Sequence, residues 1–270
     1  MAFIRRPGGA SYPTAFTGGG LEADYTADSL LLADGAPVTL LRNNTGNGVN
    51  LAPGGGGTNP TFRIDDDFLP YIAFDGVGNN LQNLAFPGGL LLTPKTMYSV
   101  LRVETPGGTA NAKAITLNRN GVVAGVADGT WTLRPDAGKR HMVQSRGIPA
   151  APIISAGVAE PNDAFSAMQG VWIVSCQRFG NRGNPATWFQ GYWQNSDGGF
   201  SVRYGGGAPF TAWNYDRLGV GSNPDIAPFA NDFCKMDFRA FSLFNVCHND
   251  VQVAQNMRFL AHKWKVGILD

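Results

Sequence analysis

Paired carboxylic side chains would give this chain glycosidase chemistry, because that reaction needs one carboxyl group protonated near neutral pH and a second one ionised. The sequence has only three glutamates, Glu22, Glu104 and Glu160, and each is isolated. The densest acidic cluster, Asp65–Asp67, would need several more oxygen ligands to hold calcium and is more typical of a solvated turn. The carboxylates therefore predict no glycosidase, no metal site and no cofactor.

Histidine and cysteine patterns give no sign of nucleophilic catalysis or of zinc binding. The chain has three of each: His141, His248, His262, Cys176, Cys234 and Cys247. No histidine lies in a Ser/His/Asp or Cys/His pattern, and the cysteines are odd in number and lack metal-ligand spacing. We interpret the histidines as structural and the cysteines as reduced, buried thiols.

Aromatic residues are the remaining candidates for ligand binding. In the run from Trp188 to Asn195, strand alternation places Trp188 and Tyr192 on one face. Trp213 and Tyr215 lie in an expected loop, where exposed aromatics beside amides suit a glycan or a protein interface. The competing interpretation is that all four pack in the core or cover its edge.

Charge and hydropathy exclude several partners. The chain has 270 residues, with 21 Lys and Arg against 20 Asp and Glu, so no field of one sign would hold a nucleic acid. The first residues, Met1–Gly9, lack a signal-peptide core, and no segment approaches the ~18 apolar residues of a membrane span. We expect cytoplasmic synthesis, no membrane insertion and no nucleic-acid partner.

Strand-length runs separated by turn signals predict an all-β fold. With 36 glycines and 17 prolines, turns punctuate almost every segment. Beyond residue 110, strands are expected at 114–117, 122–126, 130–133, 141–145, 170–177, 187–194, 200–204, 217–220 and 237–244. About a dozen strands predict a two-layer antiparallel sandwich. One amphipathic helix, capped by Asn249 or Asp250 and ending near Trp264, should lay its apolar stripe against the sandwich.

Residues 1–24 are rich in Gly and Pro and have no sustained period, so they should form an extended arm ahead of one domain, residues 25–270. Phe3, Ile4, Tyr12 and Phe16 are the arm residues that could fill pockets on a neighbour. The alternative is a disordered tail. Under the assembly interpretation, deleting residues 1–20 leaves the fold intact and abolishes attachment.

The landmarks from residue 25 to 266 resemble the concanavalin A-like lectin/glucanase jelly roll, in particular its laminin G-like branch. The matching motifs, in order, are Gly35–Val38, Asn43–Gly48, Pro60–Phe62, Phe74–Gly76, Leu218–Gly221 and the terminal Lys263-Trp264. The fold hosts lectins, hydrolases, lyases and structural modules, so it settles no function. Hydrolases of this fold carry two Glu and an Asp alternating along one strand, a pattern that this chain lacks.

The resemblance, read with the neutral charge and the arm, implies a non-enzymatic virion structural protein of a tailed bacteriophage. We expect a capsid decoration or fibre subunit, synthesised in the host cytoplasm, with virion proteins as partners and a homo-oligomer such as a trimer. The alternative is a carbohydrate-binding module or adhesin that stacks sugars on Trp188, Tyr192, Trp213 and Tyr215.

Overall fold

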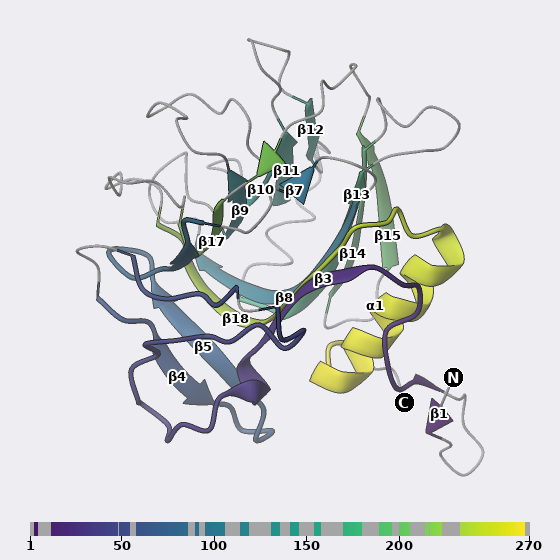
Figure 1. The fold of residues 1–270 in the computed structure, drawn as a ribbon. Helices are drawn as coiled ribbons and strands as arrows, with labels where there is room; N and C mark the ends of the chain where they lie inside the picture. Colours follow the sequence, from purple (N-terminus) through teal and green to yellow (C-terminus); the bar gives the residue numbers. More distant parts are fainter. Residues whose placement is uncertain are drawn as a thin grey trace.

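The computed structural model describes residues 3–4, 12–47, 49–54, 58–85, 90–91, 95–105, 114–118, 131–135, 141–145, 154–157, 170–179, 189–195, 200–205, 214–215, 217–222 and 233–267. These residues form two antiparallel β-sheets that face each other, with an α-helix on the outside of the larger sheet (Figure 1). The predicted all-β sandwich with a C-terminal helix is confirmed.

The larger, eight-stranded sheet has the order β15-β14-β13-β8-β18-β5-β4, with β3 also paired to β18. Its strands are β3 (Leu21–Thr26), β4 (Thr61–Ile64), β5 (Pro70–Asp75), β8 (Lys95–Thr105), β13 (Ile173–Phe179), β14 (Phe189–Asn195), β15 (Phe200–Gly205) and β18 (Lys235–Phe244). A short 3-10 helix, η1 (Ala27–Ser29), follows β3.

The smaller, six-stranded sheet has the order β12-β11-β10-β9-β17-β6. Its strands are β6 (Leu81–Asn83), β9 (Ile115–Asn118), β10 (Trp131–Pro135), β11 (His141–Ser145), β12 (Ile154–Gly157) and β17 (Arg217–Val220). Two short pairs stand apart: β1 (Phe3–Ile4) with β2 (Tyr12–Pro13), and β7 (Leu90–Leu91) with β16 (Asn214–Tyr215). The strand expected at 122–126 lies outside the described residues.

The strand β18 is the centre of the larger sheet. It pairs with β8 on one side, while its other side is shared between β5 and β3. Its inward residues Phe238 and Phe241 join the core between the sheets, and Phe244 packs on the helix side. Because its register shifts between Phe238 and Ala240, both Arg239 and Ala240 belong to the outer face.

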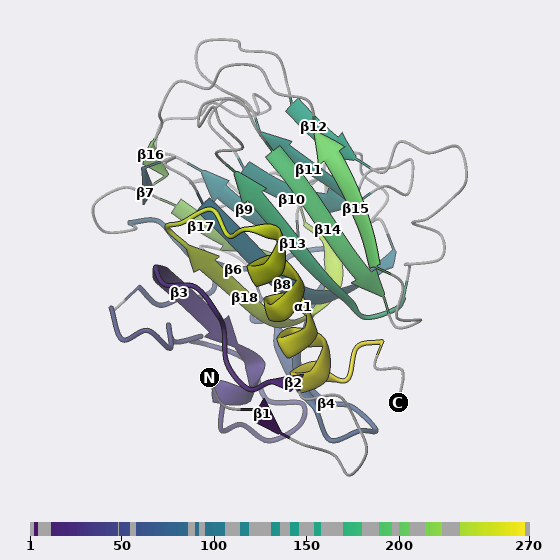
Figure 2. The same ribbon diagram turned by 90° about the vertical axis from the view of Figure 1, so that its right-hand side faces the viewer.

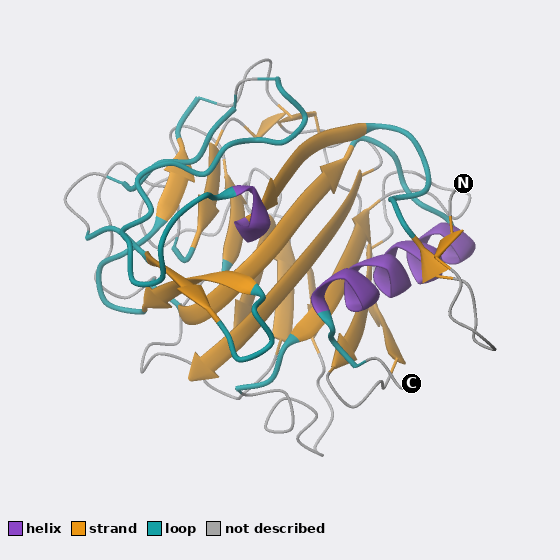
Figure 3. Ribbon diagram, turned by 90° about the horizontal axis from the view of Figure 1, so that it is seen from below, coloured by secondary structure: helices purple, strands orange, loops and turns teal. Residues whose placement is uncertain are grey.

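The helix α1 (Asp250–Trp264) lies across the outer face of the larger sheet (Figures 2 and 3). Asn249 forms a capping box with Gln252, which resolves the predicted cap, and Lys265 ends the helix in the left-handed conformation. Its buried face includes Met257, Leu260 and Trp264, as the spacing predicts. Val251, however, is exposed, because the buried stripe runs instead through Val253 and includes a polar residue, Asn256.

The described part of the N-terminal segment packs on its own domain. Phe16 contacts the rings of Tyr98, Phe244 and Phe259, with centroid distances of 5.9, 5.2 and 4.9 Å. The Thr17 backbone N–H donates to Asn256 Oδ1 at 2.7 Å. Phe16 therefore packs against the chain's own cluster beneath the helix, so deleting residues 1–20 should destabilise the fold. Its role as an anchor on a neighbour stays a prediction. The stretch from residue 21, expected in the arm, lies in β3.

Candidate functional site

The outer face of the larger sheet has a covered part and an open part. The helix lies over β13, β8 and the end of β18, whereas β4, β5 and the start of β18 lie beyond it (Figures 1 and 2). The open part holds a cleft of about 330 Å³. Its lining residues are Thr61, Arg63, Tyr71, Ala73, Phe74, Asp75, Asn79, Arg102, Glu104, Lys235 and Asp237. We call this the open-face cleft.

The register of four strands creates the cleft. Thr61 pairs with Ala73, Ala73 with Asp237, and Asp237 with Arg102, so these residues form one row across β4, β5, β18 and β8. Directly opposed residues of antiparallel strands share a face, so the row points outward together. Ala73 stands in the middle of the row, and its small side chain leaves the space that the longer residues surround.

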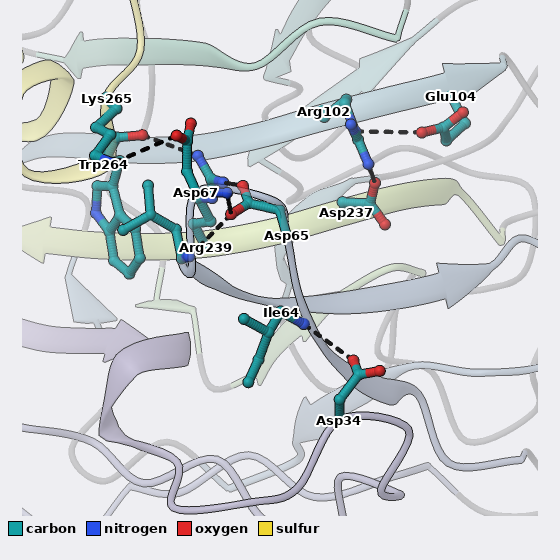
Figure 4. Close-up of polar contacts among 11 residues, drawn as sticks. Asp34, Ile64, Asp65, Asp67, Arg102, Glu104, Asp237, Arg239, Trp264 and Lys265 are labelled. Atoms are coloured by element: carbon teal, nitrogen blue, oxygen red, sulfur yellow. Dashed lines mark hydrogen bonds and ion pairs between the residues drawn. The ribbon is translucent and has the colours of Figure 1, made fainter.

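Two carboxylates converge on Arg102 in this row (Figure 4). Arg102 donates from Nη2 and Nε to Asp237 Oδ2 at 2.6 and 2.8 Å, and its Nε lies 3.2 Å from Glu104 Oε1. The Asp237 side chain is only 9% exposed. Burial raises the pKa of Asp237, while the Arg102 guanidinium opposes the rise and nearby Glu104 adds to it. The Asp237 and Glu104 carboxyl groups therefore lie in two different environments.

Aromatic rings flank the same guanidinium. Arg102 Cζ lies 5.8 Å from the ring centroid of Tyr71 and 5.1 Å from that of Trp172, and the two rings meet edge to face at 5.9 Å. These distances are in the cation–π range. Burial, followed by the charge of Asp237, raises the pKa of Tyr71, so its hydroxyl stays protonated. Tyr71 is half-buried and supplies the aromatic wall of the cleft.

Arg239 supports the aromatic wall through Trp172. Its guanidinium stacks on Trp172 at 3.8 Å, donates to the Trp264 carbonyl at 2.9 Å, and pairs with Asp65 (Figure 4). Burial lowers the pKa of Arg239 to about 10, so it remains charged at neutral pH. Asp65 Oδ1 in turn accepts from the backbone N–H groups of Asp67 and Leu69. The predicted acidic turn is thus tied to the sheet and the helix.

Polar groups close the far end of the cleft. Asp75 Oδ1 accepts from the backbone of Val77 and Gly78, and Asn79 Oδ1 accepts from the Asp75 backbone. Gly76 has φ +75, and a Cβ there would lie 2.8 Å from the Lys235 backbone nitrogen. Glycine is therefore required for this turn to reach β18.

The described residues do not test whether the four aromatics that the sequence nominates share a site. Trp188 and Trp213 lie outside the described residues. The backbone of Tyr192 pairs with Cys176 in the larger sheet, and that of Tyr215 pairs with Leu90 in a separate two-stranded sheet. For the arm, backbone pairing joins Phe3 to Pro13 and Ile4 to Tyr12.

The histidine and cysteines described next are packed inside the fold. His248 is buried, and its Nδ1 lies 2.9 Å from the Tyr98 hydroxyl. Cys176 and Cys234 are buried, and burial raises their thiol pKa values, that of Cys234 to about 12. Among the residues described, no group of three or more His, Cys, Asp or Glu could hold a metal ion, and no helix could cross a membrane.

Sequence reasoning missed the open-face cleft because its residues come from strands far apart in the chain. Glu104 looked isolated, yet it lies beside Asp237 on Arg102. One signal was available: Arg102 and Asp237 each stand between two apolar neighbours in their strands. A charge inside an apolar strand indicates a partner on a neighbouring strand.

Comparison with known proteins finds solved structures that share this fold. No family model matches the chain, and no curated protein matches it. An arabinofuranosidase solved with arabinofuranosyl-alpha-1,2-xylobiose superposes with a TM-score of 0.54 at 12% identity, covering 83% of this chain and 51% of that one. A Trypanosoma rangeli sialidase with the inhibitor DANA gives 0.57 at 15% identity, covering 95% and 35%. A sialidase from the same organism was solved with sialic acid, and gives 0.55.

These comparisons establish a shared fold and correct one prediction. The chain spans about half of the arabinofuranosidase and about a third of the sialidase. The prediction that the chain is not an enzyme is contradicted, because the similar structures are glycosidases. Counting glutamates was a poor basis for that exclusion, since a carboxyl pair formed by an Asp and a Glu of different strands escapes it.

Proposed function

We propose that this chain binds carbohydrate in the open-face cleft. The observation that carries the proposal is the cluster of Tyr71, Arg102 and Asp237, which combines an aromatic wall with fixed charged hydrogen-bonding groups in one hollow. Its volume of about 330 Å³ is at the lower end for small-ligand pockets, which suits one or two sugar rings. The glycan-acting proteins that share the fold support the proposal.

The chemistry of the cleft matches both sides of a sugar. Asp237 and Glu104 can accept hydrogen bonds from sugar hydroxyl groups. Among the described residues, the hydrogen bonds and ion pairs of Arg102 use only Nε and Nη2, so its Nη1 can donate to the ligand. The Tyr71 ring offers an apolar surface to the C–H face of the sugar. Because Arg239 and Trp172 support the wall, little side-chain freedom is lost on binding.

A glycan array followed by calorimetry on the best glycan tests this proposal. We expect Tyr71→Ala to weaken binding by about 1 kcal/mol or more, while Tyr71→Phe, which keeps the ring, retains most of the affinity. Trp213→Ala is the comparison variant for the loop aromatics. Loss of binding in Trp213→Ala with full binding in Tyr71→Ala would move the site to those aromatics.

Hydrolysis of a glycosidic bond in the same cleft is a second candidate. The raised pKa of Asp237 beside Glu104 favours it, because an acid and a base in different environments are what that reaction needs. Chromogenic arabinofuranosides and sialosides are suitable first substrates. Turnover that Asp237→Asn abolishes would support this candidate, and binding without turnover would leave only the first.

The virion role and the concanavalin A-like family remain separate proposals, based on the sequence resemblance alone. The comparisons give the virion role no support. Quantitative mass spectrometry on purified particles tests it: a fixed ratio to the major shell protein would support a decoration or fibre subunit, and absence from every particle would refute it.

A further inference from the structure

Phe68 combines backbone strain with solvent exposure. It has φ +60, a left-handed conformation that bulky side chains rarely adopt, and 86% of the residue is exposed. It stands in the turn from Asp65 to Leu69 that joins β4 to β5. Asp65 and its partner Arg239 hold that turn, so the ring is presented on a fixed support. Burial in its own chain does not explain a phenylalanine at this position.

Other exposed apolar residues gather in the same region. Five of the nine large exposed hydrophobic residues described fall in the segments 31–40 and 64–68: Leu31, Leu32, Leu40, Ile64 and Phe68. The segments are joined, because the Ile64 backbone N–H donates to Asp34 Oδ1 at 3.1 Å (Figure 4) and Gly35 N–H donates to the Phe62 carbonyl at 2.9 Å. They therefore form one surface beside β4.

The first segment also contains a hollow of about 340 Å³, which we call the leucine groove. Its lining residues are Ser29, Leu30, Leu31, Leu32, Thr39, Leu40 and Arg42. Leu31 is fully exposed at its rim. The groove offers few hydroxyl groups and no ring, so it suits an apolar side chain better than a sugar.

The charges at the two ends of this surface are complementary. Asp66 is exposed beside Phe68, and Arg42 is exposed at the leucine groove. Within the described ranges, neither side chain has an ion-pair partner. One end thus presents an aromatic ring with a negative charge, and the other presents an apolar hollow with a positive charge.

We propose that the chain self-associates by inserting Phe68 of one copy into the leucine groove of a second copy, with Asp66 facing Arg42 across the contact. A two-fold axis makes the contact reciprocal, so each copy gives one ring and receives one. The acidic turn around Phe68 disfavours an anionic lipid surface as the occupant. The strained backbone at Phe68 then has a role, because it holds the ring in the binding position before the second copy associates.

Sedimentation equilibrium of the full chain, over a concentration series, tests the proposal. We expect a dimer whose dissociation constant rises about 30-fold or more in Phe68→Asn, because the anchor ring is lost. Asparagine accepts the left-handed conformation, so this variant should fold and, at concentrations where the dimer is dissociated, melt at least as high as the wild type. Val77→Asn is the control, since Val77 is 77% exposed in the turn at the other end of β5 and should not change association.

A charge swap distinguishes this specific contact from non-specific association. Asp66→Arg and Arg42→Asp should each weaken the dimer by about tenfold, and the double variant should restore it. A wild-type chain that is monomeric at every concentration, a dimer unaffected by Phe68→Asn, or a swap without restoration would each overturn the proposal. A monomer that still binds its glycan would refute self-association and leave the carbohydrate proposal standing.

Discussion

The outer face of the larger sheet differs sharply between the part beneath α1 and the part beyond it. Beneath the helix, β8 and β18 contribute Tyr98, Val100 and Phe244 to a buried cluster. Beyond it, the same two strands contribute Arg102 and Asp237 to the open-face cleft. Both strands run through the two parts, and the register of β18 against β8 shifts between Phe238 and Ala240, near the boundary. What changes along each strand is whether a helix excludes water from the face.

The two parts also handle polar groups differently. The covered part has a network in which Asn256 Nδ2 lies 3.2 Å from the Tyr98 hydroxyl and 3.2 Å from His248 Nδ1, while its Oδ1 accepts from Thr17. Burial lowers the pKa of His248 to about 4, so this network is neutral at pH 7. The open part instead places the buried Asp237 carboxyl directly against the Arg102 guanidinium. Stability should depend on the covered part, and ligand binding on the open part.

The largest expected contrast is in side-chain truncation. Phe244→Ala should lower the free energy of unfolding by about 3–5 kcal/mol, because Phe244 is fully buried beneath the helix. Tyr71→Ala, in the half-buried wall of the cleft, should lower it by only about 1 kcal/mol. Urea unfolding of both variants measures the difference. Equal losses would mean that the open part is as important for folding as the covered part.

A pH titration tests the neutral network. The unfolded histidine has a pKa near 6.5 and His248 in the fold has one of about 4, so the unfolded state binds more protons between these values. Stability from this group is complete above about pH 6.5 and is lost as the pH falls towards 4, by about 3 kcal/mol. The groups facing it are Tyr98, Asn256 and the Arg178 guanidinium. The difference between wild type and His248→Gln isolates this contribution from that of the carboxylates. A difference that does not vary with pH would show that His248 is not held neutral.

The turn beyond the open part should respond in the opposite direction to most substitutions. Phe68→Asn is expected to raise the free energy of unfolding by about 0.5–1 kcal/mol, because asparagine relieves the left-handed strain and the exposed ring contributes little packing. Thermal unfolding at low protein concentration, where any dimer is dissociated, measures this gain. A loss of stability would mean that the ring packs on its own chain.

The smallest expected effect is at the exposed edge of the cleft. Arg63 Nη1 lies 3.5 Å from Asp34 Oδ2, and both side chains are about half exposed. Asp34→Asn keeps an oxygen for the Ile64 N–H, so its effect should stay within about 0.5 kcal/mol and shrink in high salt. A double-mutant cycle with Arg63→Ala gives the pair energy. A value well above 1 kcal/mol would place this pair among the groups that hold the fold.

The covered part was the more predictable of the two from sequence. The capping residues before Asp250 and the spacing of Met257, Leu260 and Trp264 place the helix and its contact face. Asn256 is where the pattern fails, because the sequence alone does not show that Thr17, more than two hundred residues earlier, satisfies a buried amide. Local periodicity identifies an element but not the distant partner of a buried polar group.

The open-face cleft was not predictable because it depends on register. Arg102 and Asp237 become neighbours only when β8 pairs with β18 in one register, and a shift of one residue would turn one of them inward. The aromatics Trp188 and Trp213 drew attention because they are clustered in sequence, whereas Tyr71 and Trp172 are adjacent only in space. Such neighbours depend on the order of the strands in the sheet, and that order is set by pairing between segments far apart in the sequence.

The position of β18 also governs how this protein can be made. The strands β3, β5 and β8 leave the ribosome early, yet the strand that joins them comes after residue 234. Until then the nascent chain carries strands with unpaired edges, which is the state in which sheet proteins aggregate and chaperones are needed. Translation that stops before residue 235 would split the larger sheet into the separate pieces β15-β14-β13-β8 and β5-β4 and leave β3 unpaired, so truncated products should be insoluble rather than partly active.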